Sequence, residues 1–274
     1  YDTFYLPEQK TFELSSYYPS TANATLAFIH EGNNPDNYPI LKHTGTQDNY
    51  NFFKDKNISF THVIFESSKS FVSTDDNNNT DAHSKTFKGC IFRNSSEPFF
   101  IIRGSKPSTI LFENCLFYGN TRAIELYFWN IVTPSIKFIH CTFDSNFVVF
   151  NLQGTEGGGF KSDSIKVINS IFSLNTTKIQ GDNSTFKFSD RMNDNLELND
   201  GVYISANRTK PSDWKLSVDS EARAICGASG VLRDISDTIR GSFNGKYDAG
   251  CWALLLGGPP SISLQPKDTT VAEG

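Results

Sequence analysis

Five stretches of this sequence share one pattern: Ile58-Ser-Phe-Thr-His-Val-Ile-Phe65, Lys85-Thr-Phe-Lys-Gly-Cys-Ile-Phe92, Ile110-Leu-Phe-Glu-Asn-Cys-Leu-Phe117, Ile136-Lys-Phe-Ile-His-Cys-Thr-Phe143 and Ile165-Lys-Val-Ile-Asn-Ser-Ile-Phe172. The last Phe of the pattern recurs after 27, 25, 26 and 29 residues, and a second apolar run follows three of the copies. Each repeat therefore reads as strand, bend, strand, turn, strand. A unit this short cannot bury its apolar face alone, so it must stack on its neighbours. The pattern predicts an all-β solenoid, a parallel β-helix.

Stacking predicts ladders of equivalent residues about 4.8 Å apart. The predicted ladders are Phe60, Phe87, Phe112, Phe138 and Val167; Phe65, Phe92, Phe117, Phe143 and Phe172; and Ile58, Lys85, Ile110, Ile136 and Ile165. A position filled by Val63 and Ser170 in two coils holds Cys90, Cys115 and Cys141 in the others. One Cys per coil does not converge on a tetrahedral metal site, so these cysteines are predicted to be buried free thiols.

The composition indicates a folded domain and argues against nucleic-acid binding, binding to an anionic membrane surface and a transmembrane helix. The chain has 274 residues, 38% of them hydrophobic and 20% charged, which suits a folded domain with a sizeable core. The net charge of −5 leaves no basic excess for nucleic acid or for an anionic membrane surface. The longest apolar run, Cys251 to Leu256, is far shorter than the roughly 20 residues of a transmembrane helix. Phe supplies 24 residues and favours strands.

The spacing Phe-x-x-Asn at Phe117–Asn120, Phe143–Asn146 and Phe172–Asn175 resembles the repeats of right-handed parallel β-helix surface proteins. These belong to the pectate-lyase-like superfamily, which includes polymorphic outer-membrane adhesins. The end of the chain, Asp237-Thr-Ile-Arg-Gly followed by Tyr247-Asp-Ala-Gly, is similar to the closing segment of many secreted bacterial β-helix proteins. The resemblance covers about residues 26–205 and implies a right-handed β-helix at an extracellular location.

Three parts of the chain follow from the extent of the repeat. Residues 1–25 carry no repeat and are predicted to cap the first coil. Residues 26–257 form the parallel β-helix with an irregular C-terminal region. Residues 258–274 follow the breaker cluster at 257–260 and resemble a linker and the first strands of an immunoglobulin-like domain.

Two covalent features are expected in an oxidising compartment. Cys226 and Cys251 lie outside the repeat and are predicted to form a disulfide. Asn-x-Ser/Thr sequons permit glycosylation at Asn23, Asn57, Asn78, Asn94, Asn175, Asn183 and Asn207. Asn94 and Asn175 are placed at coil turns, where a sugar could project.

Catalytic chemistry finds little support in the sequence. A polysaccharide lyase or glycosidase on a β-helix needs acidic groups gathered on one outer face, whereas Glu66 beside Arg93 and Lys88 beside Glu113 are predicted to be simple exposed pairs. His62 and His140 share a position held elsewhere by Gly or Asn, so they are interpreted as bend residues. The loop at 75–81 has oxygen ligands for a hard cation, but a solvated loop is the preferred interpretation. No catalytic residue, metal or cofactor is assigned.

An apolar stripe exceeds what a single core needs. If the small-residue and Phe ladders point inward, the residues between them point outward, and Tyr127 and Trp129 lie in a segment that is apolar on both faces. The predicted interface residues are Ile64, Ile91, Leu116, Ile171, Tyr127 and Trp129. Contiguous exposed apolar surface marks an interface; the alternative is a bend that turns the stripe inward or a loop that covers it.

These observations favour a non-catalytic structural or adhesive protein, a cell-surface or filament-forming glycoprotein subunit. Its expected partners are copies of itself or other cell-surface proteins. The alternative is a carbohydrate-active lyase or hydrolase, or a glycan-binding module that uses exposed aromatics such as Trp129.

Overall fold

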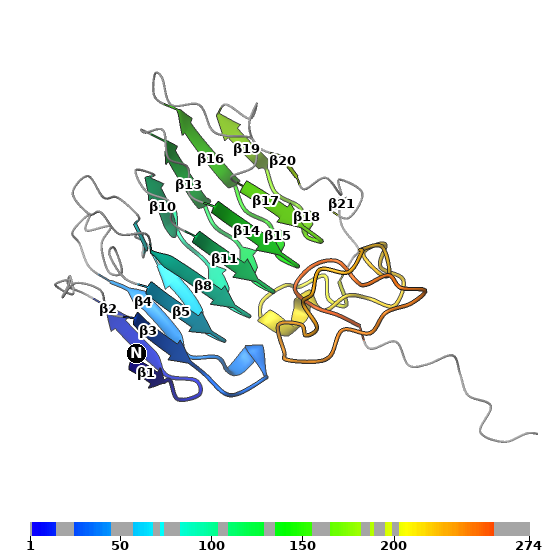
Figure 1. Cartoon of the computed structure of the whole chain (residues 1–274), viewed down its shortest axis with the longest axis horizontal. Coiled ribbons are helices and arrows are strands. Elements are labelled where there is room, and N and C mark those ends of the chain that lie inside the picture. Colours follow the sequence, from blue (N-terminus) through cyan, green and yellow to red (C-terminus); the bar gives the residue numbers. More distant parts are fainter. Residues whose placement is uncertain are drawn as a thin grey trace, which may run out of the picture.

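The computed structural model describes residues 2–14, 25–44, 57–67, 72–73, 83–103, 109–128, 135–154, 165–181, 187–188, 195–198 and 203–254. Residues 2–198 of this set build a solenoid of three parallel sheets, and residues 203–254, here called the closing segment, pack beside it (Figure 1). The all-β solenoid predicted from the repeat is confirmed. The segment from 258 to 274, with its proposed immunoglobulin-like strands, lies outside the described residues.

Sheets A and B each hold one strand from every coil. Sheet A consists of β1 (Asp2–Tyr5), β3 (Thr25–Ile29), β5 (Asn57–Thr61), β8 (Ser84–Lys88), β11 (Thr109–Glu113), β14 (Ser135–Ile139), β17 (Ile165–Ile168) and β20 (Lys187–Phe188). Sheet B consists of β2 (Thr11–Leu14), β4 (Ile40–His43), β6 (Ile64–Ser67), β9 (Ile91–Arg93), β12 (Leu116–Tyr118), β15 (Thr142–Asp144), β18 (Ile171–Ser173) and β21 (Leu196–Leu198).

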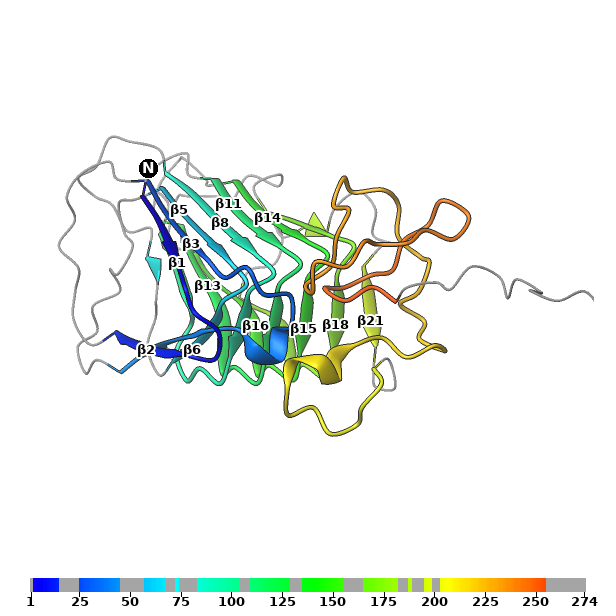
Figure 2. The ribbon, with the colours of Figure 1, turned by 90° about the horizontal axis from the view of Figure 1, so that it is seen from below.

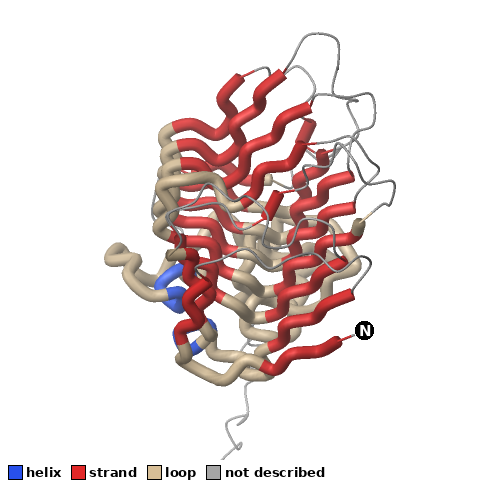
Figure 3. Tube along the Cα trace, turned by 90° about the vertical axis from the view of Figure 1, so that its left-hand side faces the viewer, coloured by secondary structure: helices blue, strands red, loops and turns tan. Residues whose placement is uncertain are grey.

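Sheet C forms the third wall. It consists of β7 (Val72–Ser73), β10 (Phe100–Arg103), β13 (Arg122–Phe128), β16 (Val148–Gly154) and β19 (Thr177–Gly181). Figure 3 shows the strands of successive coils lying over one another in these walls. Two short 3-10 helices, η1 (Pro35–Asn37) and η3 (Pro211–Trp214), lie outside the sheets.

The prediction that residues 1–25 cap the first coil is wrong for residues 2–14, which the structure describes. β1 pairs in parallel with β3, and β2 pairs in parallel with β4, so residues 2–14 supply two strands of the first coil. Phe4 is in register with Phe28, and their rings stack with centroids 5.1 Å apart. The sequence signal was missed because this coil lacks the consensus pattern, although it keeps an aromatic at the ladder position.

Stacked aromatic rings fill the interior. Strand pairing places every predicted ladder in register, including the Lys85 exception between Ile58 and Ile110. One column of rings rises from sheet A and a second from sheet B, and rings of the two columns meet edge to face, as at Phe112 and Phe117, 5.6 Å apart. Offset stacking and edge-to-face contacts are the two favoured aromatic geometries. The repeat therefore places its Phe rings where they pack favourably, both along a column and between columns.

Successive coils from β5 onward turn at left-handed corners. At the corner between sheets A and B, the residues His62, Gly89, Asn114, His140 and Asn169 have φ between 52° and 58°. This confirms that His62 and His140 are bend residues. At the corner between sheets B and C, the left-handed residues are Asn94, Gly119, Ser145 and Leu174.

The recurring asparagines of the Phe-x-x-Asn spacing bond to neighbouring coils and do not themselves adopt the left-handed conformation. Asn120, Asn146 and Asn175 come one residue after the left-handed position, and their side chains form a hydrogen-bonded ladder inside the B–C corner. Ser95 occupies the same ladder position in the coil before, and Asn94 lies outside it. The asparagines are thus selected for bonding between coils and not for tolerance of positive φ.

Candidate functional site

The closing segment covers the outer face of sheet B. Ile64, Ile91, Leu116 and Ile171 point away from the aromatic core, as predicted, but they are 0–2% exposed. They belong to a second apolar cluster whose other members include Tyr203, Trp214, Leu216, Ile235 and Trp252 of the closing segment. The prediction of an exposed interface stripe is therefore wrong, and the covering-loop alternative is what the structure shows. For the remaining predicted interface residues, Trp129 and the side chain of Tyr127 lie outside the described part.

The A–B corner holds the closing segment by side-chain bonds. Asn169 Nδ2 donates to the Gly227 carbonyl at 3.0 Å, and Asn114 Nδ2 donates to the Arg233 carbonyl at 2.8 Å. Between them, His140 Nε2 lies 2.8 Å from Ser229 Oγ. Residues 227–235 thus run along the corner in the direction opposite to the order of the coils.

Arg240 ties the segment together from within. Its guanidinium is buried and donates to carbonyls of Arg233, Asp248, Gly250 and Cys251 and to Asn114 Oδ1, over 2.7–3.3 Å. Burial lowers the pKa of Arg240, although Asp234 and Asp248 oppose this effect. The Asp248 carboxylate accepts from the backbone of Ala224 and Leu254. Arg240 and Asp248, which belong to the motifs noted in the sequence, therefore hold the closing segment together by hydrogen bonds.

Figure 2 shows the first part of the closing segment beneath sheet B, with η3 beside η1. Ser212 donates from both its backbone N and its Oγ to the Asp36 carboxylate, each at 2.7 Å. The Trp214 ring lies against Tyr118, with centroids 4.0 Å apart. Tyr203 shares a hydrogen bond with Ser173, and its burial raises its pKa. The segment thus contacts both early and late coils.

Charged groups of neighbouring coils form pairs. Arg93 Nε lies 3.0 Å from Glu66 Oε2, and Lys88 Nζ lies 3.7 Å from Glu113 Oε1, as the sequence predicted. On sheet C, the buried Glu125 carboxylate accepts from Arg122 and Asn151. Across the described ranges, no group of three or more His, Cys, Asp or Glu side chains could hold a metal ion.

The cysteines are all free thiols. Cys90, Cys115 and Cys141 are buried, which confirms the prediction for the ladder. Cys226 and Cys251 are also free and buried, so the predicted disulfide is not formed in this structure. Burial raises the pKa of the Cys251 thiol to about 12. Arg240 and the apolar cluster hold the closing segment in this structure.

The sequons fall into three groups. Asn94 and Asn207 are exposed. Asn175 is committed to the asparagine ladder, since its Nδ2 donates to the Phe143 carbonyl at 2.8 Å, and half-buried Asn57 accepts from the Ser84 backbone at 2.7 Å. Asn23, Asn78 and Asn183 lie outside the described residues, as does the acidic loop at 75–81.

A pocket of about 540 Å³ opens at the first two A–B corners. It is lined by Tyr5, Leu6, Pro7, Glu8, Ile29, His30, Glu31 and Gly32. His30 Nδ1 donates to the Leu6 carbonyl at 3.0 Å, and its buried Nε2 has no hydrogen-bond partner. The pocket therefore offers acceptor groups and one exposed aromatic ring, that of Tyr5.

No protein-family model, curated protein or solved structure matches this chain. Among the described residues, no helix has the length and apolar character needed to cross a membrane.

Proposed function

We propose that this chain is a non-catalytic structural or adhesive protein of an extracellular surface, and that it associates with a second copy through the N-terminal end of its solenoid. The observation that carries this proposal is the contrast between the two ends of the stack. The charged groups between the two ends support a structural function, since they are neutralised in pairs across coils. The sequons and the resemblance to β-helix surface proteins support the extracellular setting.

At the N-terminal end of the stack, β1 exposes two aromatic side chains, Phe4 and Tyr5. All four residues of β1 are exposed, and Phe4, at 47% exposure, ends the sheet A ring column with one face on Phe28. In the described part of the chain, β1 pairs with β3 alone. An unpaired strand edge is a template for another strand.

At the C-terminal end of the stack, charged side chains lie over the ring column. Lys178 lies over the last ring of the sheet B column, 5.7 Å from the Phe172 centroid, and pairs with Glu197. Charged side chains at a sheet end oppose further stacking. Association is therefore confined to one end, which favours a two-fold pair in which β1 meets β1 of the second copy over a filament of stacked coils.

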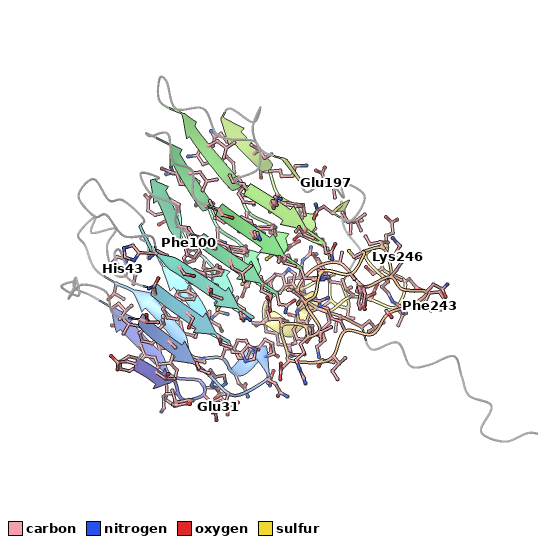
Figure 4. All side chains as sticks on the ribbon, in the orientation of Figure 1. Glu31, His43, Phe100, Glu197, Phe243 and Lys246 are labelled. Atoms are coloured by element: carbon pink, nitrogen blue, oxygen red, sulfur yellow. The ribbon has the colours of Figure 1, made fainter. Side chains whose placement is uncertain are left out.

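Sedimentation of the intact chain over a range of concentrations tests this proposal. We expect a monomer–dimer equilibrium that Phe4→Lys shifts at least tenfold toward monomer. The matched control is Phe243→Lys, because Phe243 is also exposed, at 57%, but lies at the far tip of the closing segment (Figure 4). Monomers at every concentration, or an equal effect of both variants, would contradict the proposed association. Cleavage of an acidic polysaccharide by the purified chain would contradict the non-catalytic function.

Glycan binding is the second candidate, and the pocket beside Tyr5 favours it. Protein sites for small ligands combine an apolar wall with a few polar groups, and sugar hydroxyls can donate to the carboxylates of Glu8 and Glu31. Calorimetric titration with neutral oligosaccharides should then give binding that Tyr5→Ala abolishes. Binding that Tyr5→Ala leaves unchanged would exclude this pocket.

A further inference from the structure

The fastening of the closing segment at His140 requires a neutral imidazole. His140 Nε2 lies 2.8 Å from Ser229 Oγ and 3.2 Å from Asn169 Nδ2. An amide nitrogen can only donate, so Nε2 must accept. The orientation of the Asn169 amide is fixed, because its Nδ2 also donates to the Gly227 carbonyl at 3.0 Å. The ring proton therefore sits on Nδ1, which is buried without a hydrogen-bond partner.

A second proton on His140 would break this arrangement. Nε2–H would face the Asn169 N–H, and turning the amide to accept it would set Oδ1 against the Gly227 carbonyl. The charged group that the closing segment places near the ring is the Arg240 guanidinium, which repels an imidazolium, while the Asp248 backbone offers an acceptor. Asn114 and Asn169 at the neighbouring corners are neutral. Burial, and then Arg240, hold the pKa of His140 well below its ordinary value of 6.5.

His62 lies at the other end of the docked segment and contacts it through Tyr38. Its ring stacks on Tyr38 at 4.9 Å, and the Tyr38 hydroxyl donates to the Ile235 carbonyl. His62 Nδ1 is buried without a partner. The charged or titratable groups that face it are Asp237 of the closing segment and His30 of the preceding corner. Burial lowers the pKa of His62, and Asp237 opposes the shift.

We propose that the closing segment is an acid-sensitive cover: protonation of His140 and His62 releases residues 227–251 from the A–B corner and uncovers the apolar stripe on sheet B. The sign follows from linkage. Once the segment is released, the two corner histidines meet water and regain a pKa near 6.5. The released state therefore binds more protons, so docking is complete above this pH and weakens as the pH falls. Each proton changes the docking equilibrium by about tenfold per pH unit within that window.

Tryptophan fluorescence of the intact chain reports the release. Trp252 directly follows the released residues and is 3% exposed, so its emission should shift to the red as it meets water. We expect this shift as the pH falls below about 6.5, together with binding of an apolar dye. The far-UV circular dichroism of the sheets should stay unchanged until lower pH, where carboxylates such as Asp213 begin to titrate.

His140→Asn is the matched variant, because Asn114 and Asn169 occupy equivalent left-handed corners. It should move the fluorescence midpoint to lower pH and reduce the steepness by about one proton. The control is His43→Asn: His43 is also buried but lies on β4, away from the closing segment (Figure 4). Should His140→Asn fail to fold, hydrogen exchange of the unaltered protein at residues 227–235 gives the same test, with faster exchange expected at pH 5 than the intrinsic rate change explains. A fluorescence shift that coincides with loss of the sheets, equal effects of the two variants, or pH-independent protection would overturn the proposal.

Discussion

Replacement of Asn146 by Ala measures what the asparagine ladder contributes to stability. Asn146 is 1% exposed and makes four side-chain hydrogen bonds. Its Nδ2 donates to the Phe117 carbonyl at 3.0 Å and to Asn175 Oδ1 at 2.9 Å. Its Oδ1 accepts from the backbone and side-chain nitrogens of Asn120, at 3.2 and 2.9 Å. Alanine leaves all of these groups, in the two adjoining coils, without this partner.

The expected loss is about 3–5 kcal/mol of unfolding free energy. Four bonds at a net value of about 1 kcal/mol each give about 4 kcal/mol, and buried groups left unsatisfied cost about 1–3 kcal/mol each where no water reaches them. Asn146→Ser should recover part of the loss, about 1–2 kcal/mol, because a hydroxyl can donate one bond and accept others. A serine also fits this position, since Ser95 holds it in an earlier coil, where its backbone N donates to Asn120 Oδ1.

Urea unfolding followed by circular dichroism gives the free energy, and hydrogen exchange at the neighbouring coils shows whether the loss is local. Asn207→Ala is the control, since Asn207 is exposed and surface changes usually stay within about 0.5 kcal/mol. If Asn146→Ala destabilises by less than about 1 kcal/mol, the ladder does not hold the coils together and the reasoning fails.

Four further outcomes follow from the described contacts. In a eukaryotic secretory host, mass analysis should find glycan at Asn94 when that sequon is used but none at Asn175, whose Nδ2 is bonded inside the ladder; a glycan on Asn175 in folded protein would refute this. Thiol titration of the unfolded, unreduced chain should count five free thiols, and a count of three would restore the crosslink. In the folded protein, alkylation of Cys251 should be slow at neutral pH, because burial raises its pKa. Arg240→Lys should destabilise by about 2–4 kcal/mol in urea unfolding, because a lysine has fewer donors than the five bonds made here, and an unchanged midpoint would count against that role.

The solenoid was predictable because its signal is periodic. Phe at a fixed step is visible in the sequence, and ladder geometry follows from strand pairing, so even the Lys85 exception was placed correctly. The first coil was missed because only Phe4 of its sheet A strand keeps the pattern. The sequence alone does not show the role of Asn146, because a turn asparagine can serve positive φ or bonding between coils, and only the backbone angles distinguish the two.

The closing segment was beyond sequence reasoning for a different reason. Its apolar residues, among them Trp214, Ile235 and Trp252, follow no helical or strand period, since they pack as an irregular chain held by isolated bridges. The sequence predicted that the apolar stripe points outward and must be covered. A periodic pattern does not show whether the same chain or a partner covers it. Arg240 belongs to the closing motif noted in the sequence, but the motif does not show which groups Arg240 contacts.

The two apolar clusters make the closing segment physically separable from the solenoid core. The aromatic columns lie inside the coils, whereas the cluster around Leu116 and Trp214 lies outside sheet B. Loss of the segment would therefore remove contacts from one face while every strand pair and ring stack of the core remains in place. Because the bonds of His140 at this boundary depend on its neutral state, protonation acts on the cover and spares the core. A solenoid built this way can change what one face presents without unfolding the coils that present it.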